Sequence, residues 1–284
     1  MTMQRTLSTR HWLSAEHPLW MCAMRPFFLL TMASAVLLMG LWSAVLALGW
    51  PPPPVVGGAL VWHAHELLLG FGLAAVAGFV LTAVPEFTQT AGASSRTARQ
   101  LVALWLLGRL GFWLSGSVGW PALALAGAAH VALLGGLLAL LLPALRTVAG
   151  QRHHAFGWAL AGLLLLVAGF YADALRGAYP MRWLHAVLGL LMVLIVIALS
   201  RISMRIVNRA IQQAGTGAKP YMARPPRRNL AVLCIALFTL AEFLNEGGRT
   251  SGWLACASAA ALFNLMGDWH VGRPLLQRWP LTLY

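Results

Sequence analysis

Trp62-His63-Ala64-His65-Glu66 stands at the entrance of a long apolar run, which continues over residues 67–84 without a further charge. About 20 apolar residues are enough for a helix to cross a lipid bilayer. The run is therefore predicted to cross a membrane, with two imidazoles and a carboxylate at its entrance. Ionisable side chains at membrane depth are rare and usually mark an ion path, a proton relay or a ligand site.

The composition of the whole chain is that of a membrane protein. Of its 284 residues, 60% are hydrophobic and 10% are charged, whereas about 25% of the residues in soluble domains are charged. The sequence predicts an all-α fold, a polytopic transmembrane helical bundle of about eight spans. Their approximate bounds are residues 26–49, 60–84, 100–115, 121–142, 154–175, 181–200, 229–245 and 252–266.

The spans divide the chain into four segments. Residues 1–25 form a basic N-terminal segment, and residues 26–200 form a six-span membrane core. A basic linker, residues 201–228, follows, and residues 229–284 form a C-terminal membrane hairpin and tail. The second span is expected to end at Pro85, because proline interrupts the hydrogen bonding of a helix.

The positive charges indicate the orientation of the bundle. If the N-terminus is cytoplasmic, 16 of the 20 Lys and Arg residues fall in cytoplasmic segments. Lys and Arg collect in the cytoplasmic loops of membrane proteins. Both ends of the chain are therefore predicted to be cytoplasmic. This bias also accounts for the net charge of +13, and no nucleic-acid-binding module is visible between the apolar runs.

The three cysteines, Cys22, Cys234 and Cys256, stand far apart in the chain. Without a Cys-x-x-Cys pair, the sequence encodes neither a zinc knuckle nor a covalent c-type haem attachment. Each cysteine is expected to be a small buried apolar residue.

The predicted topology gathers several ionisable groups at one depth. The second and sixth spans both enter from the outer side, which places His63, His65, Glu66 and His185 in the outer leaflet. His130 lies deeper, on the fourth span. Independent placement on separate helices would not be expected to bring so many titratable groups to one face of the membrane.

The spacing of the two histidines limits what they can bind together. On a regular helix His65 lies about 200° round from His63, so the pair could not ligate one metal. Either the helix starts only after His65, or the two imidazoles serve two centres. Gly70, Ala74 and Gly78 form a stripe of small residues, which lets another helix or a flat ligand approach closely.

Simpler roles are open for each of these residues. His63, His65 and His185 lie near tryptophans and could be interfacial side chains bonded to headgroups. His130 could bond a backbone carbonyl of a neighbouring helix, and Glu66 could accept a hydrogen bond from an imidazole. A role for Arg109 in pairing with an acid or with carbonyls is favoured over contact with a substrate.

Two classes of function remain open on this basis. Neutral imidazole is the usual protein ligand of haem iron and copper, and Arg25, Arg109 or Arg182 could pair with haem propionates. Alternatively, the protein is a membrane carrier for an ion or small ligand, whose relay uses the same His and Glu groups.

Several motifs of the chain are similar to those of a known family. The sequence resembles the NnrS family in Arg25-Pro26-Phe27-Phe28-Leu29-Leu30, Trp62-His63-Ala64-His65-Glu66-Leu67-Leu68-Leu69-Gly70-Phe71, Ala77-Gly78-Phe79-Val80-Leu81-Thr82-Ala83-Val84-Pro85, Leu104-Trp105-Leu106-Leu107-Gly108-Arg109-Leu110 and Trp183-Leu184-His185-Ala186. The likeness covers most of residues 19–210 and more loosely the remainder. The block His63-Ala64-His65-Glu66 is its most specific part.

The resemblance implies a multi-pass protein of the bacterial inner membrane that contains non-covalent b-type haem and copper. The family is tied to nitric oxide and denitrification, and no established catalytic reaction comes with it. The resemblance makes His63, His65 and His185 the best ligand candidates. His130 and Glu66 are further metal candidates, and Arg25 and Arg109 are candidate cofactor contacts.

Family members usually continue for several further spans. The resemblance therefore implies either a C-terminally shortened member or a chain whose C-terminal part is missing. If that part supplies ligands, this chain would hold one metal centre rather than two, or neither stably.

Overall fold

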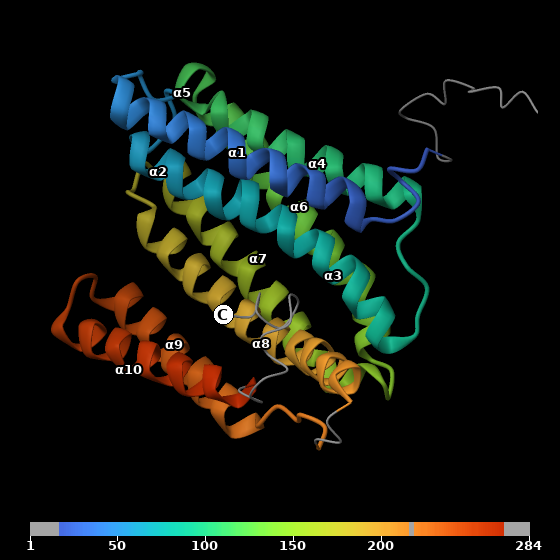
Figure 1. Ribbon diagram of the computed structural model, residues 1–284. Helices are drawn as coiled ribbons and strands as arrows, with labels where there is room; N and C mark the ends of the chain where they lie inside the picture. The colour runs from blue at the N-terminus through green and yellow to red at the C-terminus, as the bar shows by residue number, and fades with distance from the viewer. Residues whose placement is uncertain (1–16, 216–218, 270–284) are drawn as a thin grey trace, which may run out of the picture. The chain divides into compact units, whose positions relative to one another are not determined.

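The computed structural model describes residues 17–215 and 219–269 (Figure 1). The chain divides into two compact units, Met1–Pro180 and Met181–Tyr284. Within the described ranges every regular element is a helix, so the predicted all-α class is confirmed.

The helices of the first unit run roughly along one direction (Figure 1). They are α1 (Met24–Leu48), α2 (Gly58–His65), the π-helix η1 (Glu66–Gly72), α3 (Leu73–Thr88), α4 (Ser95–Trp113), α5 (Ser115–Val118), α6 (Trp120–Leu145), the 3₁₀ turn η2 (Gly150–His153) and α7 (His154–Leu175). The second unit contains α8 (Met181–Ala214), α9 (Pro225–Leu244), α10 (Arg249–Met266) and the 3₁₀ turn η3 (Gly267–Trp269).

Five helical stretches are long and apolar enough to cross a membrane. They are Met24–Leu48, Gly58–Thr88, Trp120–Leu145, Gly150–Leu175 and Met181–Ala214, and each coincides with a predicted span. The other three predicted spans correspond to α4, α9 and α10. Whether these three cross the membrane stays a prediction, as does the orientation.

Two helices run further than the sequence pattern suggested. The second span does not end at Pro85, because α3 continues to Thr88 and stops at Gln89, whose φ of 55° is left-handed. Neighbouring helices and side chains let membrane helices tolerate a proline. Likewise, α8 extends 14 residues into the predicted linker, because residues 201–214 contain neither proline nor glycine, and it ends before Gly215, where φ is 61°.

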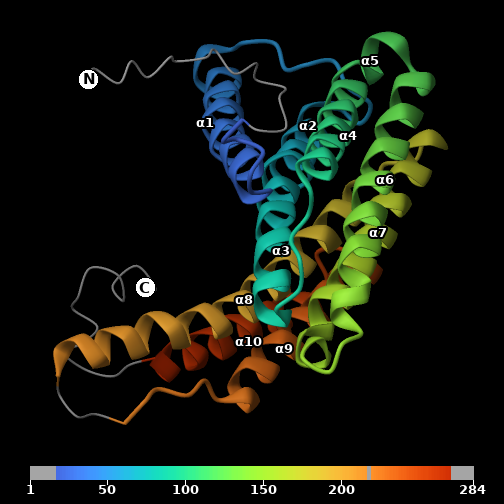
Figure 2. The ribbon, with the colours of Figure 1, turned by 90° about the vertical axis from the view of Figure 1, so that its right-hand side faces the viewer.

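The helices of the first unit approach closely where one of them carries a glycine. A Cβ at Gly111 of α4 would lie 2.8 Å from the carbonyl oxygen of Ala122 and 2.9 Å from the amide nitrogen of Ala126, both on α6. Figure 2 shows α4 and α6 side by side. At Gly78 of α3, a Cβ would lie 2.8 Å from the ring of Phe28 on α1. The predicted close approach along the small-residue stripe is thus made by a helix.

The second unit is held by the packing of α8 and α10 on α9. Its buried core consists of Val196, Val207, Ile211, Tyr221, Ala231, Ile235, Ala261 and Leu265. A Cβ at Gly189 of α8 would clash with the side chain of Thr239 on α9. The glycine therefore sets how closely these two helices can pack.

We expect the substitution Gly111→Ala to destabilise the first unit by about 1–3 kcal/mol, because the added methyl group meets backbone atoms that cannot rotate away. Thermal unfolding of the detergent-solubilised protein would measure this as a fall of about 5 °C in Tm. Gly135→Ala on α6 is the matched control, because nothing lies within 4 Å of its added Cβ. An equal loss of stability in both variants would contradict the close α4–α6 contact.

Candidate functional site

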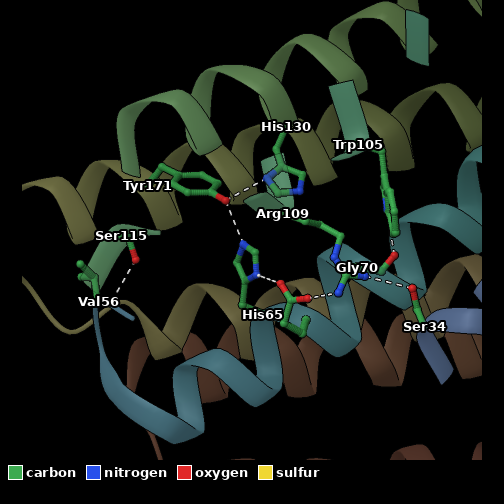
Figure 3. Close-up of polar contacts among 10 residues, drawn as sticks. Ser34, Val56, His65, Gly70, Trp105, Arg109, Ser115, His130 and Tyr171 are labelled. Carbon is green, nitrogen blue, oxygen red and sulfur yellow. Dashed lines mark hydrogen bonds and ion pairs between the residues drawn. The ribbon is translucent and has the colours of Figure 1, made fainter. Parts of the chain in front are cut away.

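A chain of polar side chains crosses the interior of the first unit (Figure 3). It is centred on His65 at the end of α2 and Glu66 at the start of η1, which are 0% and 1% exposed. The Nδ1 atom of His65 lies 3.1 Å from Oε1 of Glu66. The other ring nitrogen, Nε2, lies 2.8 Å from the hydroxyl of Tyr171 on α7. Both nitrogens of this imidazole are therefore engaged.

The hydroxyl of Tyr171 bridges two imidazoles. Besides His65, it lies 2.8 Å from Nδ1 of His130 on α6, and His130 is fully buried. A hydroxyl carries one proton, so it donates to one ring nitrogen and accepts from the other. The Nε2 atom of His130 is buried and makes no hydrogen bond within the described structure.

On the other side of His65, the chain continues through an ion pair to a serine. The carboxylate of Glu66 pairs with the guanidinium of Arg109 on α4. Arg109 also donates through Nη1 to Oγ of Ser34 on α1, at 3.0 Å. Its guanidinium carbon lies 4.7 Å from the centre of the Trp105 ring, within the range of a cation–π contact. Side chains from α1, α2, η1, α4, α6 and α7 thus meet in one hydrogen-bonded chain.

The π-helical turn lies directly beside this chain. The carbonyl of Gly70, inside η1, accepts a hydrogen bond of 3.0 Å from the indole N–H of Trp105. A Cβ at Gly70 would lie 2.7 Å from Nη1 of Arg109, so only glycine leaves room for the guanidinium there. Single π-helical turns inside α-helices occur frequently at functional sites.

Two further glycines make room for the polar rings. A Cβ at Gly108 of α4 would lie 2.6 Å from Cε1 of His130. A Cβ at Gly127 of α6 would lie 2.9 Å from Cγ of Tyr171. The buried rings therefore pack against bare backbone, and the helices can close around them.

The two neighbouring histidines have different surroundings. His65 stacks on Phe112, with 3.5 Å between ring centres. His63 is half-buried and stacks on Trp42 of α1, with 4.1 Å between ring centres. Because α2 begins at Gly58, a helix that starts only after His65 is wrong. The other expectation, that the two imidazoles serve two centres, stays a prediction; their two rings contact different aromatic neighbours.

His185 belongs to the second unit and lies on α8. Its side chain is 41% exposed, and Nδ1 lies 3.5 Å from Oε1 of Glu246. The predicted common depth of His185 with the histidines of the first unit stays a prediction. Arg182, one turn earlier, has its guanidinium over the rings of Trp183 and Phe243.

Several of the simpler expectations can be compared with these contacts. Arg109 pairs with an acid, as expected. His130 contacts a hydroxyl, whereas a backbone carbonyl of a neighbouring helix was expected. Arg25 is exposed and donates to the carbonyl of Pro18 at 2.6 Å. The expectation of a buried side chain is wrong for Cys256, which lies on an exposed face of α10.

The sequence reasoning did not single out Tyr171, although it joins the two histidines. The sequence does indicate a polar role for this residue, because a phenol inside the apolar run 154–175 needs a hydrogen-bond partner once it is buried. Ser34, at the far end of the hydrogen-bonded chain, was also missed, because a single serine in an apolar span forms no recognisable motif.

The described residues do not assemble a multidentate metal site. Within residues 17–215 and 219–269, no group of three or more His, Cys, Asp or Glu side chains is placed to hold a metal ion. A groove of about 690 Å³ lies between α4 and α6, from Thr97 to Leu107 on α4 and from Gly136 to Leu140 on α6. Its described lining includes no residue of the polar chain.

Comparison with known proteins gives one match. A family model described as NnrS protein matches residues 18–284 of the chain. No curated protein and no solved structure matches.

We expect Glu66→Gln to destabilise the first unit by about 3–5 kcal/mol, because Arg109 would keep a buried charge without its counter-ion. Thermal unfolding of the purified protein measures this loss. The double variant Glu66→Gln, Arg109→Met removes both charges and should recover a large part of it. A double variant as unstable as Glu66→Gln alone would show that the unpaired charge is not the cause.

Tyr171→Phe should cost about 1–3 kcal/mol, because it leaves buried ring nitrogens of His65 and His130 without their partner. The same unfolding experiment applies. Tyr179→Phe is the control, because Tyr179 is 60% exposed. Equal stability of the two variants would mean that the bridging hydroxyl contributes nothing.

Proposed function

This chain belongs to the NnrS family, and from that membership we propose that it is a membrane protein of the nitric-oxide response that binds haem. Five of its described helical stretches have the length and apolar character of membrane spans. The bacterial inner membrane is the proposed location. A role in binding or tolerance is preferred to an enzymatic one, because none of the contacts described defines a reaction.

The buried polar chain is the observation that carries the proposal. Glu66, Arg109 and two imidazoles lie in an interior whose other buried side chains are mostly apolar, and His65 and His130 are both fully buried. Ionisable groups at such depth are costly, and they mark functional sites by default. A chain that served only as a scaffold would be more stable with apolar side chains at these positions.

A haem requires an imidazole with an accessible ring nitrogen. The exposure of His63 and His185 fits this requirement, because both are partly accessible. His65 is a less direct candidate, because ligation would replace one of its two hydrogen bonds. When bound, haem iron supplies a site for a small diatomic ligand.

The protein's own residues would prepare that site. Glu66 would fix the ring orientation of His65, in the way that carboxylates orient ligand imidazoles, and Arg109 pairs with the other oxygen of the carboxylate.

Copper is less well supported than haem. Copper centres use several convergent nitrogen or sulfur donors, and the described residues do not bring three such donors together. Copper is therefore proposed on the family resemblance alone, and no step of the mechanism is assigned to it.

The rival function is a membrane carrier that moves a proton with its substrate. It is favoured by the continuity of the polar chain, in which each contact from Arg109 through Glu66, His65 and Tyr171 to His130 is a hydrogen bond or an ion pair. Chains of this kind serve as proton relays in membrane transporters.

An absorption spectrum and a metal analysis of the detergent-purified protein separate the two functions. We expect a Soret band, and we expect His63→Ala or His185→Ala to lose most of it. His154→Ala is the control, because His154 Nε2 lies 2.7 Å from the carbonyl oxygen of Leu145, a local backbone contact. A folded protein without colour or metal would refute the haem proposal and leave the carrier.

A further inference from the structure

A small basic cavity lies in the second unit, where α8 passes the start of α9. Its volume is about 80 Å³, and its lining includes Ser200, Arg201, Met204, Arg224 and Arg228. All of these residues lie in the second unit. The cavity is separate from the polar chain and plays no part in the proposed haem binding.

The length of α8 places this cavity at the edge of the membrane. The helix has 34 residues, which corresponds to about 50 Å at 1.5 Å per residue. The hydrocarbon core is about 30 Å thick, or roughly 20 helical residues. A helix that enters this core at Met181 leaves it near Ser200. The cavity therefore lies at the level of the lipid headgroups, on the side that the Lys/Arg bias predicts to be cytoplasmic.

The charge around the cavity is strongly positive. Residues 201–228 contain seven Lys and Arg residues and no acid. Asp268 approaches from η3, with a carboxylate oxygen 3.9 Å from Nε of Arg224. However, Asp268 is already paired with Arg227 at 2.9 Å and accepts the backbone N–H of Arg224. One carboxylate therefore faces several arginines.

The contacts of Arg224 and Arg228 do not cancel this positive charge. Arg228 donates through Nε and Nη2 to the side-chain oxygen of Asn229, at 3.1 and 2.8 Å. That oxygen belongs to a neutral side chain, so it brings no negative charge to the cavity. The side chain of Arg224 is 68% exposed and can turn toward an arriving anion.

We propose that this cavity binds the phosphate of an anionic phospholipid headgroup. Guanidinium groups match the geometry of phosphate oxygens and bind them with paired hydrogen bonds. Basic pockets beside membrane helices on the cytoplasmic side recognise anionic headgroups. The volume suits one phosphate group, and the flanking hydrocarbon of α8 lies where the acyl chains of such a lipid would run.

Native mass spectrometry of the full-length protein in detergent tests this proposal. Phosphatidylglycerol and phosphatidylcholine would be added in parallel, and the bound fraction of each measured. The variant R224Q/R228Q should bind phosphatidylglycerol about 25-fold more weakly, at roughly fivefold for each charge near the membrane surface. The control R176Q/R249Q removes two exposed arginines elsewhere and should bind as the unmodified protein does.

Two further binding measurements show which part of the lipid the cavity recognises. Inorganic phosphate at millimolar concentration should compete weakly, because it lacks the acyl chains; complete displacement of the lipid would show that the cavity is a site for free phosphate. The variant R224K/R228K keeps both charges but loses the paired hydrogen bonds, so it should bind phosphatidylglycerol more weakly than the unmodified protein and more tightly than R224Q/R228Q. Equal binding of the two lipids, or equal losses in R224Q/R228Q and the control, would overturn the proposal.

Discussion

The carboxylate of Glu66 is the constraint on which the first unit depends. A buried carboxylate carries a large desolvation cost unless a cation and hydrogen-bond donors meet it. Arg109 supplies the cation and His65 supplies a ring nitrogen. Each of these groups is itself buried or partly buried, so each needs further partners. The chain therefore extends through Tyr171 and His130 on one side and Ser34 on the other.

This requirement also explains the positions of small residues in the surrounding helices. The two imidazoles, the phenol and the guanidinium need space on the helices opposite them. Glycines at positions 70, 108 and 127 supply that space, because a Cβ at each would meet the ring or guanidinium opposite it. Packing and electrostatics are thus coupled, and neither the charges nor the glycines can be understood separately.

Much of this arrangement can be predicted from the sequence, for reasons specific to each part. The apolar runs gave the positions of the long helices, because the thickness of a bilayer sets their length. The block from His63 to Glu66 identified the entrance of the central helix, since ionisable residues in an apolar run are conspicuous. A polar partner for Arg109 could be expected from chemistry, because a charge inside an apolar span needs an acid or carbonyl groups to pair with, but the sequence did not identify Glu66 as that partner.

Other features could not be predicted, because they depend on tertiary contacts. The link between His65 and His130 runs through Tyr171, which is 106 residues from His65 in the chain. No spacing rule connects residues so far apart. The continuation of α3 past Pro85 depends on its neighbours, which compensate for the missing backbone bond. The end of α8 was placed too early, because polar residues indicate the limit of the hydrocarbon layer and not the limit of the helix.

The π-helical turn has a consequence for which faces of this span are buried. Each additional residue turns the rest of a helix by about 100°. The wide turn at Glu66–Gly72 therefore offsets α3 from α2 by an angle that a continuous α-helix would not have. His65 before the turn and Ala74 and Ala77 after it are all fully buried. A continuous α-helix over the same residues would turn one of these halves away from the interior. In this segment the geometry of the turn, as much as the identity of the residues, decides which side chains face the interior.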